Sequence, residues 1–443
     1  MKPLRHPVLG LFRPIVRFLH TEAAGGIVLL ACTAIALCLA NSPWSGDYAD
    51  FWHTHFVIGF GDWKLDQPLE WWVNDGLMTL FFFVVGLEIK REIVEGELRD
   101  PRKAALPAAA ALGGMIVPAL IYYSLQRGTV GERGWGVPMA TDIAFVVGVL
   151  ALLGPRVPAG LKILLLSLAI VDDLGAVLVI AVAYTSNTSF IWLGVAGLLL
   201  VFVFGARLAG VRAFGFYFFV GGFVWLAMVH SGVHPTIAGV ILGLITPARG
   251  WVGKSSLLAL LDNVLQRLKV DPTDDRLHSF NDEMLAVAEY SQNALSPLDR
   301  LEKTLHPWVA FGIMPLFALV NAGVPFRGEL LASPVALAVA LGLFIGKPVG
   351  VVLFSWLAAR LGVARFPVGV TFPVLIGAGL LAGIGFTMSL FISGLAFPGQ
   401  DGLLDAAKSG TLTGSVVSAI TGAIVLLAVL PPLTRRHENA HGV

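Results

Sequence analysis

Residues 161–184 read LKILLLSLAIVDDLGAVLVIAVAY, an apolar run that two adjacent acids, Asp172 and Asp173, interrupt. A run of about 20 apolar residues is long enough to cross a bilayer as a helix. Each carboxylate at the centre of such a helix costs roughly 2.5–3.5 kcal/mol on insertion scales. Two in succession therefore predict a site for a proton or a cation inside the membrane.

Adjacent side chains on a helix point about 100° apart, so these two acids can face different neighbours. One can meet a basic residue on another helix while the other faces a cavity. Lys347, in LGLFIGKPVGVVLF, is the basic residue that we place in a membrane interior. A Lys–Asp pair that titrates together can carry a proton. The alternative is a permanent ion pair that only holds helices together.

The composition indicates an all-α membrane protein that forms a single polytopic domain over 1–443. The chain is 56% hydrophobic and 13% charged, against about 25% charged residues in soluble domains. Cys32 and Cys38 lie in one apolar span and indicate neither a disulfide nor a metal motif. The sequence has no P-loop, zinc motif or Gly-x-Ser-x-Gly elbow, so we expect no enzyme activity and no cofactor.

Apolar length predicts about twelve spans, at 24–41, 71–89, 104–125, 136–153, 160–184, 189–206, 213–230, 234–247, 307–323, 334–357, 369–396 and 411–432.

The distribution of basic residues predicts the orientation in the membrane. Roughly 24 of the 30 Lys and Arg fall on one side, which is cytoplasmic by the positive-inside rule. Both termini are then cytoplasmic. The connection 42–70 is external and contains HFVIGFGDWKLD, a candidate β-hairpin that a second copy of the chain could stabilise. The connection 248–306 is a long cytoplasmic loop with amphipathic helices, which indicate a surface or regulatory role.

Two further spans carry residues that break helices. In the fourth, Pro138 precedes the polar pair Thr141–Asp142; in the eleventh, four glycines precede Thr387 and Ser389. Helices that are interrupted inside a membrane are typical of transporter sites. Asp142 could compensate the positive ends of two half-helices. The alternative interpretation of the glycines is close helix packing.

Several stretches resemble the NhaA-type sodium/proton antiporters over nearly the whole chain. They are FFFVVGLEIKREIVEGELRD, PMATDIAF, LAIVDDLGAV, SGVHPTIAGVILG, LHPWVAFGIMPLFALVNAGV and IGKPVG. The resemblance implies twelve helices with an inverted repeat of spans three to five and ten to twelve. It also implies that the interrupted spans 4 and 11 cross at mid-membrane, and that the protein lies in the bacterial inner membrane.

The resemblance also assigns roles to residues. Asp173 resembles the main cation ligand, with Asp172 and Thr141 beside it, and Asp172 resembles the acid that pairs with Lys347. Asp142 matches the residue at the helix crossing. Four further residues match the family's cation pathway and its pH-sensing entrance: Asp75, Glu88, Glu302 and His306. Lys303 stands where the family often has a second histidine, which leaves the pH set-point open.

We therefore expect a secondary antiporter that exports Na⁺ or Li⁺ in exchange for protons, is electrogenic, and is activated at alkaline pH. Its expected partners are these ions, membrane lipid and a second copy of the chain, with no nucleic acid. Two alternatives remain at this point. One is a sodium-coupled symporter for an organic anion, for which Lys347 is the only candidate anchor. The other is a membrane assembly or sensor protein in which the acid pair is structural.

Overall fold

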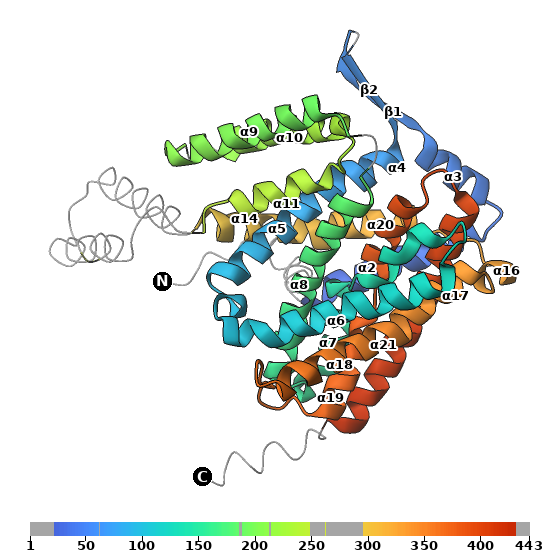
Figure 1. Ribbon diagram of the computed structural model, residues 1–443. Coiled ribbons are helices and arrows are strands. Elements are labelled where there is room, and N and C mark those ends of the chain that lie inside the picture. Colours follow the sequence, from blue (N-terminus) through green and yellow to red (C-terminus); the bar gives the residue numbers. More distant parts are fainter. Residues whose placement is uncertain are drawn as a thin grey trace, which may run out of the picture.

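The computed structural model describes residues 22–61, 63–185, 188–211, 214–248, 262 and 296–430 (Figure 1). The predicted cytoplasmic positions of the two termini, and most of the predicted loop 248–306, lie outside these residues. The described residues form helices throughout, apart from one short hairpin.

The helices of the first part of the chain begin and end close to the predicted spans. In chain order they are α2 (Glu22–Ala40), α3 (Ser45–His53), α4 (Leu69–Trp71), η1 (Trp72–Leu77), α5 (Met78–Val94), η2 (Glu97–Arg99), α6 (Pro101–Gln126), η3 (Glu132–Met139), α7 (Ile143–Leu153), η4 (Gly154–Arg156), α8 (Ala159–Ala183), α9 (Phe190–Leu208), α10 (Phe214–Ser231) and α11 (Thr236–Ile245). The second part of the chain contains α14 (Pro297–Trp308), η5 (Val309–Ile313), α15 (Met314–Asn321), α16 (Gly328–Leu331), α17 (Pro334–Leu341), η6 (Gly342–Gly346), α18 (Lys347–Arg360), α19 (Phe372–Ala382), α20 (Phe386–Ala396) and α21 (Asp401–Val429).

Eight helices in the described part of the chain are long and apolar enough to cross a membrane, and the number is ten if each of two bent pairs counts as one span. Many large apolar side chains on these helices face outward. Val182, Leu198 and Phe218 are 83%, 71% and 73% exposed. Such exposure is unfavourable in water and natural against lipid tails, so the chain is an all-α multi-pass membrane protein.

Two helices begin earlier than apolar length predicted. The ninth predicted span opens at 307, whereas α14 begins at Pro297; the twelfth opens at 411, whereas α21 begins at Asp401. In both cases the added turns carry charged residues, among them Glu302 and Lys408, which lower the hydropathy without ending the helix. Hydropathy therefore located the apolar part of each helix and missed its polar first turns.

Glycines bring two pairs of helices into backbone contact. A Cβ atom on Gly350 of α18 would lie 2.0 Å from the carbonyl oxygen of Gly113 on α6. Between α5 and α11, a Cβ on Gly243 would lie 2.6 Å from the carbonyl oxygen of Phe83. Small residues allow this approach because they leave no side chain between the helices. The α6–α18 contact also buries Lys347 completely, since its stem packs beside Gly114.

The connection 42–70 contains an antiparallel hairpin of β1 (His55–Phe60) and β2 (Trp63–Pro68), which projects from the helices in Figure 1. Its register pairs Val57 with Asp66 and Ile58 with Leu65. The turn passes through Gly61, whose φ of 61° is a conformation that favours glycine. Phe56, Val57 and Ile58 are each about half exposed, so β1 offers an apolar surface.

Candidate ion-binding site

The acid pair lies inside the bundle on α8, a helix of 25 residues. Asp172 is 1% exposed and Asp173 is 2% exposed. Apolar residues surround the pair along the helix, so this segment buries two carboxylates that water cannot solvate freely. A carboxylate buried in this way is costly unless it is paired, neutralised by a proton or bound to a cation.

Asp172 has its partner in Lys347. The Nζ atom of Lys347 lies 2.5 Å from Oδ2 of Asp172, and both side chains are fully buried. The same ammonium group donates to the carbonyl oxygen of Met139, just before the start of α7. The hydroxyl of Thr141 lies 2.6 Å from Oδ2 of Asp172 and 2.9 Å from the carbonyl oxygen of Ala382, either of which can accept its proton. The structure therefore brings three of the predicted residues together around one carboxylate oxygen.

Asp173 differs from its neighbour. Among the residues that the structure describes, no donor reaches its buried Oδ1 atom, and no ion pair involves its carboxylate. Its side chain lines a cavity of about 690 Å³. An unpaired carboxylate beside a cavity is a receptive site for a small cation or a proton. This arrangement agrees with the prediction that one acid meets a basic residue on another helix and the other faces a cavity.

The carboxylate of Asp142 caps the N-termini of two helices, α7 and α20. Its Oδ1 accepts from the backbone N–H of Phe145 at the start of α7, at 3.1 Å. Its Oδ2 accepts from the backbone N–H of Thr387 at 3.1 Å, and from the Thr387 hydroxyl, at the start of α20. The backbone N–H of Asp142 donates to the carbonyl oxygen of Ile384 at 2.7 Å. One carboxylate thus compensates the partial positive charge at the beginnings of two helices.

The segment between α19 and α20 needs a second cap, which the sequence analysis missed. The two helices are bent by 46° at their break. Ser415 of α21 accepts hydrogen bonds from the backbone N–H groups of Gly385 and Phe386, at 3.2 and 3.1 Å. Ser415 belongs to an ordinary small-residue stretch of α21, so nothing in the sequence distinguishes it from a packing residue.

The mouth of the cavity carries several charged groups from different helices. Arg91 of α5 forms an ion pair with Glu302 of α14, and His306 follows one turn later on α14. Glu88 is half-buried on the same side of α5 as Arg91. All four side chains line the cavity that reaches Asp173. Arg91 was not singled out from the sequence, because it stands in a run of ordinary interfacial charges.

Asp75 lies apart from this group. It stands in η1, where its Oδ1 lies 3.3 Å from Nε2 of His234, in the connection between α10 and α11. It does not line the cavity of Asp173 within the described residues. Six of the nine predicted site residues line this cavity, and Asp172 and Lys347 lie beside it through the contacts of Asp172 with Thr141 and Lys347. Asp75 stands at another place.

The geometry suits exchange of hard cations and protons. Carboxylate, hydroxyl and carbonyl oxygens are the ligands that small hard cations prefer. The same carboxylate oxygens bind protons, so the two ions compete for one site. Lys347 pairs with one carboxylate, and the second has no ion-pair partner within the described residues.

Comparisons with known proteins agree with this chemistry. The sequence profile of the family described as Na⁺/H⁺ antiporter 1 matches residues 16–426. A protein of Rhodopirellula baltica named Na(+)/H(+) antiporter NhaA is 51% identical over 430 residues, which cover 97% of each chain. A protein of the same name from Rhizobium meliloti is 48% identical over 433 residues, 97% of this chain and 98% of the other. Na(+)/H(+) antiporter NhaA 2 of Acidiphilium cryptum is 52% identical over 417 residues, 94% of this chain and 92% of the other.

Proposed function

The chain belongs to the Na⁺/H⁺ antiporter 1 family, and from that premise we propose that it expels Na⁺ or Li⁺ from the cell in exchange for protons. The observation that carries the proposal is the unpaired carboxylate of Asp173 at the inner end of the cavity. It offers one negative charge to one small cation, beside an acid that Lys347 already neutralises.

Exchange follows from competition at these carboxylates. When the site faces one side of the membrane, Na⁺ displaces protons from Asp173; when it faces the other side, protons displace Na⁺. Alternating access then moves the two ions in opposite directions without a further energy source.

We assign Asp173 as the main cation ligand, with Asp172 and Thr141 beside it. The hydroxyl of Thr141 already contacts Asp172 and Ala382, so it would have to turn to reach the ion.

Resemblance to the family implies two protons for each cation, and the site has enough titrating groups for this ratio. Asp173, Asp172 and Lys347 together can carry two protons for each Na⁺. The cycle then moves net charge, and the membrane potential contributes about 2.3 kcal/mol per charge per 100 mV. The exchange is therefore electrogenic, and an inside-negative potential favours cation export.

The proposed membrane arrangement has about twelve spans. The eight long helices and the two bent pairs give ten, and α5 and α11 add two more. The breaks before α7 and between α19 and α20 meet at Asp142, where spans 4 and 11 would cross at mid-membrane. Resemblance to the family implies the bacterial inner membrane, and the positive-inside rule places both termini and the loop 248–306 in the cytoplasm.

Ion flux in proteoliposomes tests the proposal directly. With a proton gradient imposed, addition of Na⁺ or Li⁺ should collapse that gradient in vesicles that hold the protein and no organic solute. Empty vesicles and K⁺ serve as controls. A requirement for an organic anion would instead indicate symport, and an absence of Na⁺-dependent flux would leave the acid pair structural.

Asp172→Asn tests the charge-carrying role of the paired acid. The amide cannot share a proton with Lys347, so we expect some exchange to persist with less charge moved per Na⁺. Membrane current and radioactive sodium uptake, measured on the same vesicles, give this ratio. Asp47→Asn, an exposed acid on α3, is the matched control and should keep the wild-type ratio. Normal turnover with an unchanged ratio in Asp172→Asn would contradict the role.

Exchange should increase as pH rises, because the carboxylates must lose protons before they bind Na⁺.

His306→Ala should shift this pH profile of exchange toward lower pH without ending transport. Histidine gains a positive charge on the acid side of neutrality, where it would repel cations at the cavity mouth. We expect a shift of up to about one pH unit. Sodium-driven proton flux measured across pH tests this. Loss of activity at every pH would make His306 structural, and an unaltered profile would assign the whole pH response to the acids.

The hairpin is our proposed dimer contact. Both of its edges lack a third strand in the described chain, and β1 exposes Phe56, Val57 and Ile58. Pairing with a second copy would satisfy an edge and cover these side chains. Replacement of residues 56–67 by a Gly-Ser linker should yield monomers in native mass spectrometry that retain Na⁺-driven proton flux. A stable dimer in that variant would place the interface elsewhere.

A further inference from the structure

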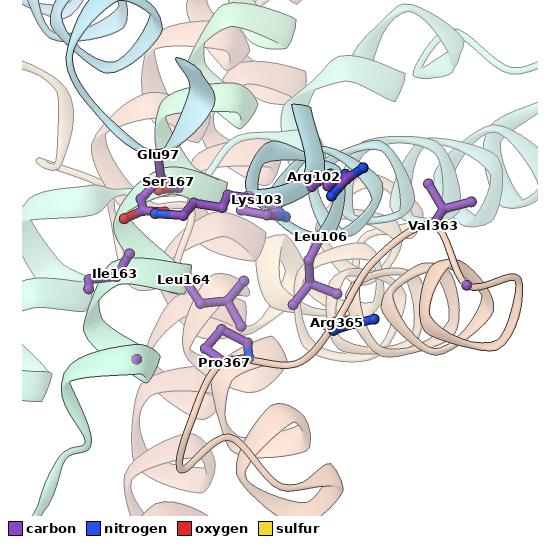
Figure 2. A pocket seen from close by; sticks show the side chains of 13 residues that line it. Glu97, Arg102, Lys103, Leu106, Ile163, Leu164, Ser167, Val363, Arg365 and Pro367 are labelled. Carbon is purple, nitrogen blue, oxygen red and sulfur yellow. The ribbon is translucent and has the colours of Figure 1, made fainter. Parts of the chain in front are cut away.

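A second cavity, of about 770 Å³, lies at the beginning of α6 (Figure 2). The acid pair does not line it, but it adjoins the cavity of Asp173 and shares Glu97, Lys103, Ile163 and Ser167 with it. The first turns of α6, the first half of α8 and the connection between α18 and α19 enclose it. Its lining residues are Glu97, Arg102, Lys103, Leu106, Pro107, Gly160, Ile163, Leu164, Ser167, Gly362, Val363, Arg365 and Pro367.

The polar lining of this cavity has an excess of positive charge. Three basic side chains, Arg102, Lys103 and Arg365, stand against one acid, Glu97. Lys103 forms an ion pair with Glu97 at 3.4 Å, which leaves the charges of the two arginines in excess. No acid pairs with either arginine within the described residues. Guanidinium groups bind phosphate oxygens through paired hydrogen bonds, so these arginines suit a phosphate-bearing ligand.

Apart from Ser167, the rest of the lining is apolar. Figure 2 shows Glu97, Ser167, Lys103 and Arg102 along one side of the cavity, with Leu164, Leu106, Pro367 and Arg365 on the other side. The connection that closes the cavity also exposes Val363 by 60% and Val368 by 94%. Apolar residues in a connection flanked by arginines are typical of a segment at the membrane interface.

We propose that this cavity binds the phosphate headgroup of an anionic phospholipid. Arg102 and Arg365 would hold the phosphate, and the acyl chains would leave along the apolar side, past Val363. A free phosphate ion would use the same arginines but would gain nothing from the apolar wall. The site lies at the end of the bundle that the basic residues place in the cytoplasm, where anionic headgroups face Lys and Arg side chains.

The test is lipid retention by the purified full-length protein in native mass spectrometry. The probes are phosphatidylglycerol and phosphatidylcholine, added separately to the detergent-solubilised protein. Arg102→Gln combined with Arg365→Gln should weaken phosphatidylglycerol binding roughly thirtyfold, from about 1 kcal/mol for each basic residue. Lys103 is left unchanged because it also lines the cavity of Asp173.

Two variants control for charge and for the arginine positions. Arg127→Gln combined with Arg133→Gln removes the same charge near the other end of α6 and should retain the lipid. Arg102→Lys combined with Arg365→Lys keeps the charge but loses the paired hydrogen bonds, so it should bind phosphatidylglycerol more weakly than wild type and more tightly than the glutamine variant. The proposal is wrong if wild-type protein holds both lipids equally, or if the Arg102/Arg365 glutamine variant binds phosphatidylglycerol like wild type. Displacement of bound phosphatidylglycerol by inorganic phosphate at low concentration would also overturn it, because the site would then favour the free ion.

Discussion

Asp173→Asn is expected to abolish Na⁺-driven and Li⁺-driven proton movement while the protein remains folded in the membrane. The amide preserves the size and shape of the side chain and removes the charge that would bind the ion. Asp173 Oδ1 is buried without a donor among the described residues, so no existing hydrogen bond is lost on substitution. Neutralising an unpaired buried carboxylate should leave stability unchanged or raise it.

The measurement is proton flux in proteoliposomes after addition of Na⁺, together with the melting temperature of the purified variant. Asp47→Asn carries the same chemical change on an exposed acid and should transport like wild type. Retained cation-driven flux in Asp173→Asn would refute the ligand assignment. A collapse of the melting temperature would instead show that Asp173 has a structural partner.

Lys347→Ala should produce the largest loss of stability among these variants. Lys347 is fully buried and bonds both Asp172 and the Met139 carbonyl oxygen, so its removal leaves a buried carboxylate without its charge partner. Breaking a buried ion pair by removing one partner typically costs about 3–5 kcal/mol. Exchange should also lose its coupling to charge movement, because Lys347 can no longer share a proton with Asp172.

A double-mutant cycle separates the pair from its surroundings. Lys347→Ala combined with Asp172→Asn should cost less than the two single changes added together, since no charge is left buried and unpaired. Lys347→Ala combined with Asp47→Asn should be additive, because Asp47 lies on the exposed surface of α3. Thermal unfolding in detergent supplies the four stabilities in each cycle. Additive losses for Lys347 and Asp172 would mean that the two side chains do not interact in solution.

The sequence alone was sufficient to predict which charged residues lie inside the membrane-spanning bundle. Asp172, Asp173, Asp142 and Lys347 stand out because a charge among apolar residues is costly, and the structure places all of them inside the bundle. The helix breaks were likewise readable, because Pro138 and the glycines before Thr387 disfavour a continuous helix. The family resemblance then supplied roles that no residue pattern could give.

Groups that look ordinary in sequence could not be predicted. Ser415 caps α20, and the carbonyl oxygen of Met139 accepts from Lys347, yet neither differs from its neighbours in type. Arg91 pairs with Glu302 over 211 positions of the chain, and local periodicity carries no information about such a contact. The contact between Asp75 and His234 was likewise not predictable, and the role of Asp75 on the cation pathway, which the family resemblance implies, stays a prediction.

The glycine contacts between helices limit how the protein can move. The backbones of α6 and α18 touch at Gly113 and Gly350, and those of α5 and α11 touch at Phe83 and Gly243, with no space for even a methyl group. Sliding or rotation within either pair would force main-chain atoms to overlap. Each pair should therefore behave as a rigid body, and any hinge must lie between the pairs. Spin labels on α6 and α18 should keep one separation throughout the transport cycle, whereas labels on α5 and α18 should report two.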